Sequence, residues 1–270
     1  MVTNTQINIG DDWKTVDAMQ INIGDAWKAV AGAQINIGDD WKTVFTGPFN
    51  GNATLTNGLE AFYGFTSDAT DDSGNYDGTV DGATHASTGG VPGGKYGFDG
   101  TNDHISLGDW NPGDSNSRVA FSISLWIKST DTTGYWFTRW IALDNSRYVR
   151  FYVNTNLNLI IGNSGGTGVG SRVEKAFTPS GDWQHIVGTW DSTGDGKARV
   201  YIDGTLWDTA PTGYTTALKD VSGDNTFLGQ DNDGSGLEFT GDMDGVGVWN
   251  RALTTTEITA LYNSGNGLTY

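Results

Sequence analysis

Five side chains near the middle of the chain have the chemistry of a carbohydrate site. The segment TGYWFTRW, residues 133–140, contains Tyr135, Trp136 and Trp140, with Asp144 shortly after it and Trp110 beside an expected loop. Sugars are bound by aromatic rings that stack on their apolar CH faces and by polar groups that bind their hydroxyls. These five residues are the candidate carbohydrate-binding residues. The alternative for Trp136 and Trp140 is packing in the core.

The glutamates argue against catalysis. A glycosidase needs two carboxyl groups held roughly 5–9.5 Å apart. No two glutamates of this chain lie within five residues of each other; they are Glu60, Glu174, Glu238 and Glu257. No Ser/His/Asp grouping stands out, and no phosphate-binding loop with its lysine. We therefore expect a protein that is not an enzyme.

The elements that must position these residues are short strands. From about residue 55 onward, β-type runs recur between Gly, Asp and Asn turns, and Asp203-Gly204 indicates a hairpin. One helix is expected near the end, where Thr254 and Glu257 form a capping box. This pattern predicts an all-β, two-sheet antiparallel sandwich. Four tryptophans fall within expected strands and are predicted in its core: Trp126, Trp183, Trp190 and Trp249.

A fourteen-residue unit opens the chain three times. Its copies are QINIGDDWKTV at 6–16, QINIGDAWKAV at 20–30 and QINIGDDWKTV at 34–44. Alternating Ile-Asn-Ile, a Gly-Asp turn and a second extended run predict a β-hairpin in each copy. A three-residue loop, Gly10-Asp11-Asp12, would place Ile9 opposite Trp13 on one face.

One such hairpin is too small to be stable alone. Burying one Trp and two Ile contributes at most roughly 5–9 kcal/mol, whereas ordering eleven backbone residues costs about 11–22 kcal/mol. Neighbouring copies, another part of the chain or another subunit must cover the apolar face, and we expect a homo-oligomer. A self-contained cap is the alternative. The candidate assembly residues are Ile9, Trp13, Ile23, Trp27, Ile37 and Trp41.

Charge and composition exclude several classes of partner. The net charge is −17, which argues against nucleic acid and against an anionic membrane surface. The chain has no cysteine and no apolar run of transmembrane length, and we do not expect MVTNTQINIGDD to act as a signal peptide, since it has no basic start and no hydrophobic stretch. An extracellular type of domain without an export signal fits a virion or particle surface, reached by release on lysis.

Five ordered blocks of the chain resemble laminin-G-like jelly rolls of the concanavalin A-like lectin/glucanase superfamily. The blocks are GFDGTNDHISLGD (97–109), FSISLWIKS (121–129), GDWQHIVGTWD (181–191), ARVYIDGTL (198–206) and MDGVGVWNRALTTTEITALYNSG (243–265). The resemblance implies a concanavalin A-like jelly roll over residues 49–270, which follows a hairpin module over residues 1–48. This superfold hosts many functions, so it does not by itself predict one.

The same resemblance implies a structural Ca²⁺ at the edge of the sandwich. Family members often use one Asp near the first strand and one near the last, and the matching residues are Asp72 and Asp244. Where relatives commonly have Asp-Glu, this chain has Asp244-Gly245, so one ligand is missing. The alternative is that both carboxylates form turns and cap backbone amides.

The repeats are similar to short Ile-x-Ile-x-Gly-x-Trp-Lys-x-Val units of bacteriophage tail and other virion proteins. We therefore predict a non-enzymatic virion or surface-assembly protein. The repeats would dock it to structural proteins of the particle, and the sandwich would be displayed for adhesion to glycans or a host surface. One alternative is a purely structural decoration or fibre subunit. Another is a polysaccharide depolymerase.

Overall fold

The computed structural model describes two separate parts of the chain. Within residues 6–46 it describes the backbone of six strands, and residues 55–268 are described except 75, 92, 109–117, 140–148, 163–169, 219–225 and 232–236. The chain divides into two compact units, Met1–Asn57 and Gly58–Tyr270. Each unit is considered by itself.

Each repeat forms one antiparallel hairpin. The three hairpins are separate two-stranded sheets that pair β1 with β2, β3 with β4 and β5 with β6. Their strands are β1 (Gln6–Ile9), β2 (Asp12–Thr15), β3 (Gln20–Ile23), β4 (Ala26–Ala29), β5 (Gly32–Ile37) and β6 (Asp40–Thr46).

The register of these hairpins differs from the sequence-based expectation. Two residues, not three, separate β1 from β2, so Trp13 pairs with Asn8 and Ile9 pairs with Asp12. Because one step along a strand changes the face, the positions of Ile7 and Ile9 fall on the opposite face from that of Trp13. The other two copies have the same register. Each ribbon thus has apolar positions on both faces.

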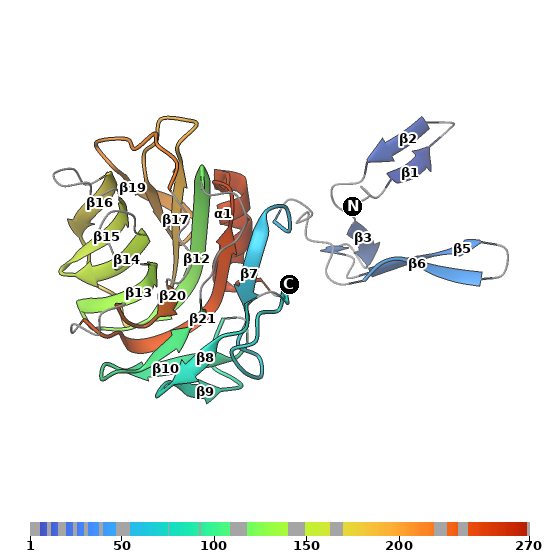
Figure 1. The fold of residues 1–270 in the computed structure, drawn as a ribbon. Helices are drawn as coiled ribbons and strands as arrows, with labels where there is room; N and C mark the ends of the chain where they lie inside the picture. The colour runs from blue at the N-terminus through green and yellow to red at the C-terminus, as the bar shows by residue number, and fades with distance from the viewer. Residues whose placement is uncertain are drawn as a thin grey trace. The chain divides into compact units, whose positions relative to one another are not determined.

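The second unit is a sandwich of two antiparallel sheets, which confirms the predicted fold class (Figure 1). The eight-stranded sheet has the order β19-β18-β17-β12-β21-β10-β9, and β7 also pairs with β21. Its strands are β7 (Leu59–Tyr63), β9 (Thr84–Ala86), β10 (Lys95–Asp99), β12 (Ala120–Lys128), β17 (Trp183–Asp191), β18 (Arg199–Ile202), β19 (Thr205–Thr209) and β21 (Thr240–Trp249).

The seven-stranded sheet has the order β16-β15-β14-β13-β20-β11-β8. Its strands are β8 (Thr79–Asp81), β11 (His104–Ser106), β13 (Thr133–Arg139), β14 (Val149–Asn154), β15 (Asn156–Ile161), β16 (Ser171–Ala176) and β20 (Thr226–Leu228). The described residues also form the helix α1 (Thr255–Tyr262) and the single 3-10 turn η2 (Asn263–Gly265). None of the described helices is long and apolar enough to cross a membrane.

The core lies between the two sheets. Alternate residues of β12, such as Phe121, Ile123 and Leu125, have no exposed surface and belong to the same cluster as the inward residues of β14 and β15. The sheets approach closely at Gly188 of β17, where an added Cβ would lie 2.9 Å from Leu159 Cδ2. A glycine in the middle of this strand therefore has a packing reason.

The helix α1 begins at a capping box and covers part of the outer face of the eight-stranded sheet. Thr254 accepts the amide of Glu257, and the Glu257 carboxylate accepts the amide of Thr254. Beneath the helix the rings of Trp126, His185 and Tyr262 form a stack, with 4.9 Å between the first two centroids and 6.2 Å between the last two. This stack ties the end of α1 to β12 and β17.

His185 is buried in its neutral form. Its Nε2 lies 2.7 Å from Ser124 Oγ, its Nδ1 has no hydrogen-bond partner among the described residues, and its side chain is 1 % exposed. Burial alone lowers the pKa of His185 to about 3. The folded protein therefore binds fewer protons at this site than the unfolded chain does below about pH 6.5.

We predict that His185 makes the protein sensitive to acid. The free energy of unfolding should fall as the pH decreases from about 6.5 toward 3, because only the unfolded chain takes up the proton freely. His185→Phe retains a ring in the stack but cannot titrate. Urea unfolding at about pH 7 and about pH 4 should show a smaller loss of stability for this variant than for the unmodified protein. Equal losses in the two proteins would contradict the prediction.

Candidate functional site

Trp136, the central residue of the predicted carbohydrate site, lies in the core. The pairing of β13 with β14 contains a bulge between Tyr135 and Phe137, so that Trp136 and Phe137 both lie in the core. Trp136 has no exposed surface, and its ring meets Phe151 edge-on at 5.5 Å. A side chain without exposed surface cannot stack on a sugar, so this assignment is corrected.

Tyr135 lies on the other face of the same sheet and is largely covered. Its ring packs against Tyr152 at 4.8 Å, with the Arg150 guanidinium 5.8 Å from its centroid, and it is 6 % exposed. Burial raises the pKa of its hydroxyl. Little of this ring is available to a ligand. The other three predicted carbohydrate residues lie outside the described residues: Trp110, Trp140 and Asp144.

Asp244 ties a glycine-rich loop to the outer face of the eight-stranded sheet. The loop joins β9 to β10, and its Val91 amide donates to Asp244 Oδ2 at 2.6 Å. Gly93 also donates to this carboxylate, and Gly245 donates to Oδ1 at 2.6 Å. Asp244 is fully buried, and burial raises its pKa to about 7 despite these three donors. The carboxylate thus fixes the loop against β21.

The same loop holds an aromatic ring at the sheet surface. The Trp183 indole N–H donates to the Gly89 carbonyl at 3.0 Å, and the side chain remains partly exposed. Trp183 had been predicted in the core. It is instead the first residue of β17, and the preceding Ser180-Gly181-Asp182 turn is the sequence signal for a position at the end of the sheet.

Trp183 begins a row of side chains that runs across four neighbouring strands. Lys128 of β12 pairs directly with Trp183 on one side and with Asp242 of β21 on the other. Lys95 of β10 binds Asp242 through Nζ–Oδ2 at 2.6 Å. We call these four residues, Trp183, Lys128, Asp242 and Lys95, the Trp183 row. They combine an aromatic ring, two ammonium groups and a carboxylate at one surface.

Trp207 is the other partly exposed tryptophan of the described residues, and its ring is already occupied. Lys175 Nζ lies 4.7 Å from the centroid of this ring and donates to the Trp207 carbonyl at 3.1 Å. Phe177 meets the ring edge-on at 5.8 Å. Trp183 has no comparable cation over it in the described part of the chain. It is therefore the better candidate for stacking on a sugar.

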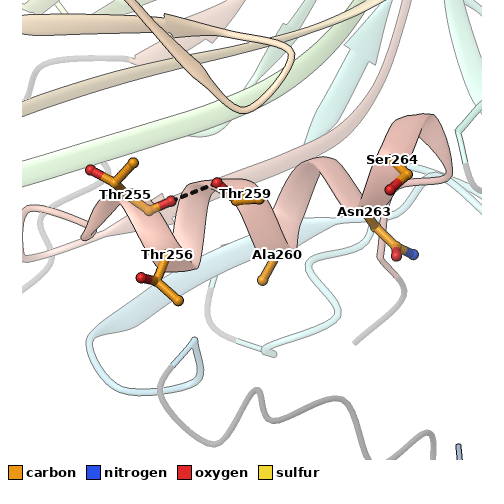
Figure 2. A pocket seen from close by; sticks show the side chains of 6 residues that line it. All are labelled: Thr255, Thr256, Thr259, Ala260, Asn263 and Ser264. Carbon is orange, nitrogen blue, oxygen red and sulfur yellow. Dashed lines mark hydrogen bonds between the residues drawn. The ribbon is translucent and has the colours of Figure 1, made fainter.

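A shallow depression lies along α1, but only this helix and the turn that follows it line the depression. Figure 2 shows that its lining residues come from α1 and the turn that follows, and that Thr259 Oγ1 donates to the Thr255 carbonyl at 2.9 Å. The lining residues are Thr255, Thr256, Thr259, Ala260, Asn263 and Ser264. A ligand here would be contacted from one side by small polar groups only.

The pair Ser124–His185 has the composition of a nucleophile and base, yet it is enclosed. Both side chains are at most 2 % exposed, and the ring of Tyr262 stacks on that of His185. Asp203 lies nearby but accepts the backbone amide of His185 rather than its ring. A hydrolytic triad needs the acid at the imidazole Nδ1 and a substrate path to the serine. The described residues provide neither.

The acidic loop after β7 is organised by Asp71, which the sequence analysis did not single out. Asp71 is 2 % exposed and accepts the amides of Phe62, Ser73 and Tyr76. Asp72 accepts the Gly64 amide at 3.1 Å through Oδ2, and burial raises its pKa. Both neighbouring carboxylates therefore cap backbone amides.

A comparison with known families decides which family the chain represents. The family model described as the concanavalin A-like lectin/glucanases superfamily, in its laminin-G form, matches residues 99–259. The chain belongs to this family. The predicted resemblance to laminin-G-like domains is thus confirmed.

Relatives of this laminin-G-like chain include much larger proteins. The chain is 29% identical over 154 residues to the "Sushi, von Willebrand factor type A, EGF and pentraxin domain-containing protein 1" of Rattus norvegicus. This match covers 54% of this chain and 4% of that protein. The adhesion G-protein coupled receptor D1 of Homo sapiens is 33% identical over 95 residues, 35% of this chain and 11% of the receptor. The chain therefore spans only a small part of these relatives.

Solved structures share the fold. One of them is domain 4 of AbnA, a GH43 extracellular arabinanase from Geobacillus stearothermophilus, in complex with arabinotriose. Its TM-score to this chain is 0.55 at 23% sequence identity, and the match covers 74% of this chain and 96% of that one. The ligand binding domain of botulinum neurotoxin serotype D in complex with N-acetylneuraminic acid has 0.56 at 14% identity, covering 77% of this chain and 51% of that one. At these identities the likeness establishes the fold alone.

Within the described residues, only Asp72 and Asp244 represent the calcium site that the laminin-G-like resemblance implies. Ca²⁺ takes six to eight oxygens, whereas the described residues contain no group of three His, Cys, Asp or Glu that could hold a metal. Asp72 and Asp244 both accept backbone amides, as the capping alternative predicts. The described residues fit amide capping better than a calcium cage, and calcium binding stays a prediction.

This prediction has a direct test. If Asp72 and Asp244 hold calcium, a chelator should lower the melting temperature by several degrees, since a ligand bound only to the folded state stabilises it. Added calcium should restore the temperature, and Asp72→Asn should remove the response. An unchanged melting temperature together with no metal in elemental analysis would contradict calcium binding and leave capping as the role of both carboxylates.

Proposed function

We propose that the sandwich is a non-enzymatic glycan-binding module whose aromatic contact is Trp183. The carrying observation is that the residue is partly exposed while its indole N–H is fixed by the Gly89 carbonyl. Fixing a ring before a ligand arrives reduces the entropy lost on binding. The neighbouring Lys128 and Asp242 supply a donor and an acceptor for hydroxyl groups.

The comparisons support a binding role for the sandwich. Two solved domains with the same fold carry sugars in their structures, arabinotriose in one and N-acetylneuraminic acid in the other. One relative is an adhesion receptor. These proteins differ in their other parts, so they favour a binding role for the shared sandwich rather than a particular sugar.

The acidic residues favour binding over hydrolysis. Three of the four glutamates are held by arginines: Glu60 by Arg118, Glu174 by Arg172 and Glu257 by Arg251. Glu60 lies in a buried pair, where burial raises its pKa to about 7 even with Arg118 beside it. These arginine pairs are roles in stability, which supports binding rather than hydrolysis.

The proposed role of the repeats is attachment and assembly on a virion or other particle surface. Apolar positions on both faces of each ribbon require cover on both sides, which other copies or structural proteins of the particle would supply. Weak glycan contacts made by many sandwiches on one particle would then add up to strong adhesion. The particle context itself rests on the resemblance of the repeats to virion units.

Trp183→Ala should abolish glycan binding without unfolding the protein. Loss of the ring is expected to weaken binding at least about tenfold, or about 1.4 kcal/mol. Binding to an immobilised glycan array measures this effect. Trp207→Ala is the matched control, because Lys175 already covers that ring, and it should bind as the unmodified protein does. Equal binding by both variants, or no binding by the unmodified protein, would contradict the proposal.

Removing the repeats should abolish assembly. We expect the full chain to be oligomeric and a chain beginning at residue 49 to be monomeric, since the sandwich contains a complete core. Light scattering of both proteins across a range of concentrations gives their masses. The same mass per chain in both proteins would show that the repeats are not an assembly module.

A further inference from the structure

We propose that the ligand of the Trp183 row is an acidic sugar, whose carboxylate is bound by Lys128 while its ring stacks on Trp183. This inference rests on the proposed function and adds to it the charge of the ligand. It follows from the placement of Lys128 between Trp183 and Asp242, and from the way in which the nearby charges are already paired.

The spacing of Lys128 and Trp183 suits one sugar unit. The two residues are directly opposite each other on adjacent antiparallel strands, so their Cβ atoms lie about 4.5–5.5 Å apart on one face. An ammonium group on a long flexible stem beside a fixed ring can reach a group on the edge of a sugar that lies on that ring. In a uronic acid, the carboxylate is such a group.

The other charges of the row are used within it. Asp242 binds Lys95 at 2.6 Å, and its Oδ1 lies over Gly97, where an added Cβ would be 3.3 Å away. Asp244, one step along the same face, directs its carboxylate to the amides of the β9–β10 loop. Lys128 is exposed and makes no ion pair with any residue that the structure describes.

A lysine that forms no ion pair within the described part of the chain is notable in a protein with a net charge of −17. Such a chain repels anions at long range, so an anionic ligand needs a local positive group beside a second type of contact. Lys128 and Trp183 supply this combination. A neutral sugar would use the ring but leave the ammonium group without a counter-charge.

The experiment compares two trisaccharides that differ only at C6: trigalacturonate, with carboxylates, and the matching neutral galactotriose. Calorimetric titration of the full chain should show at least about tenfold tighter binding of trigalacturonate. Lys128→Gln should remove that preference, so that the two sugars bind equally. Asp242→Asn frees Lys95 and should increase the preference several-fold. Lys197→Gln makes the same change of charge in the turn at the other end of β17 and should have no effect on either sugar.

The outcomes separate this inference from the proposed function. Equal binding of the two sugars, with both lost in Trp183→Ala, would overturn the acidic ligand and retain the glycan site. A preference for trigalacturonate that persists in Lys128→Gln would overturn the role of Lys128. No binding of either sugar, combined with a negative glycan array, would overturn the proposed function itself.

Discussion

The candidate site depends on one buried carboxylate. Asp244 accepts amides from Val91, Gly93 and Gly245, and this holds the β9–β10 loop down on β21. The loop in turn presents the Gly89 carbonyl that fixes Trp183. Burying a carboxylate is costly unless donors surround it, and burial raises its pKa to about 7 even here. Burial of the Asp244 carboxylate therefore lowers the stability of the fold, at the same place where this carboxylate positions the β9–β10 loop.

Whether a tryptophan lies in the core or at the surface is decided by register, which local sequence patterns specify poorly. In β13 a bulge places two consecutive residues, Trp136 and Phe137, in the core, so these two rings are packing rather than a sugar platform. Trp183 fits the pattern of a core strand but begins β17 beside a turn. The sequence predicted the strands themselves because alternation and turn residues are local signals. Bulges and strand ends depend on the partner strand, which no local pattern contains.

The repeats show the same division between what sequence predicts and what it leaves open. Glycine and aspartate between two alternating runs predict a hairpin, and each copy forms one. The choice of a two-residue over a three-residue loop shifts the register by one and places Ile9 and Trp13 on opposite faces instead of the same face. The capping role of Asp72 and Asp244 was foreseen as an alternative. The Gly89–Trp183 contact was not, because 94 residues separate the two partners.

The charge of the whole chain and the charge of the Trp183 row act over different distances. At physiological ionic strength the Debye length is about 8 Å, so most of the distant aspartates are screened from a bound sugar. Lys128 lies within that distance of a ring stacked on Trp183, because the two are directly paired. At low salt the repulsion by the net charge of −17 extends further and opposes the approach of an anionic polymer. An acidic chain can therefore bind an acidic glycan through a local lysine, as we propose for the Trp183 row.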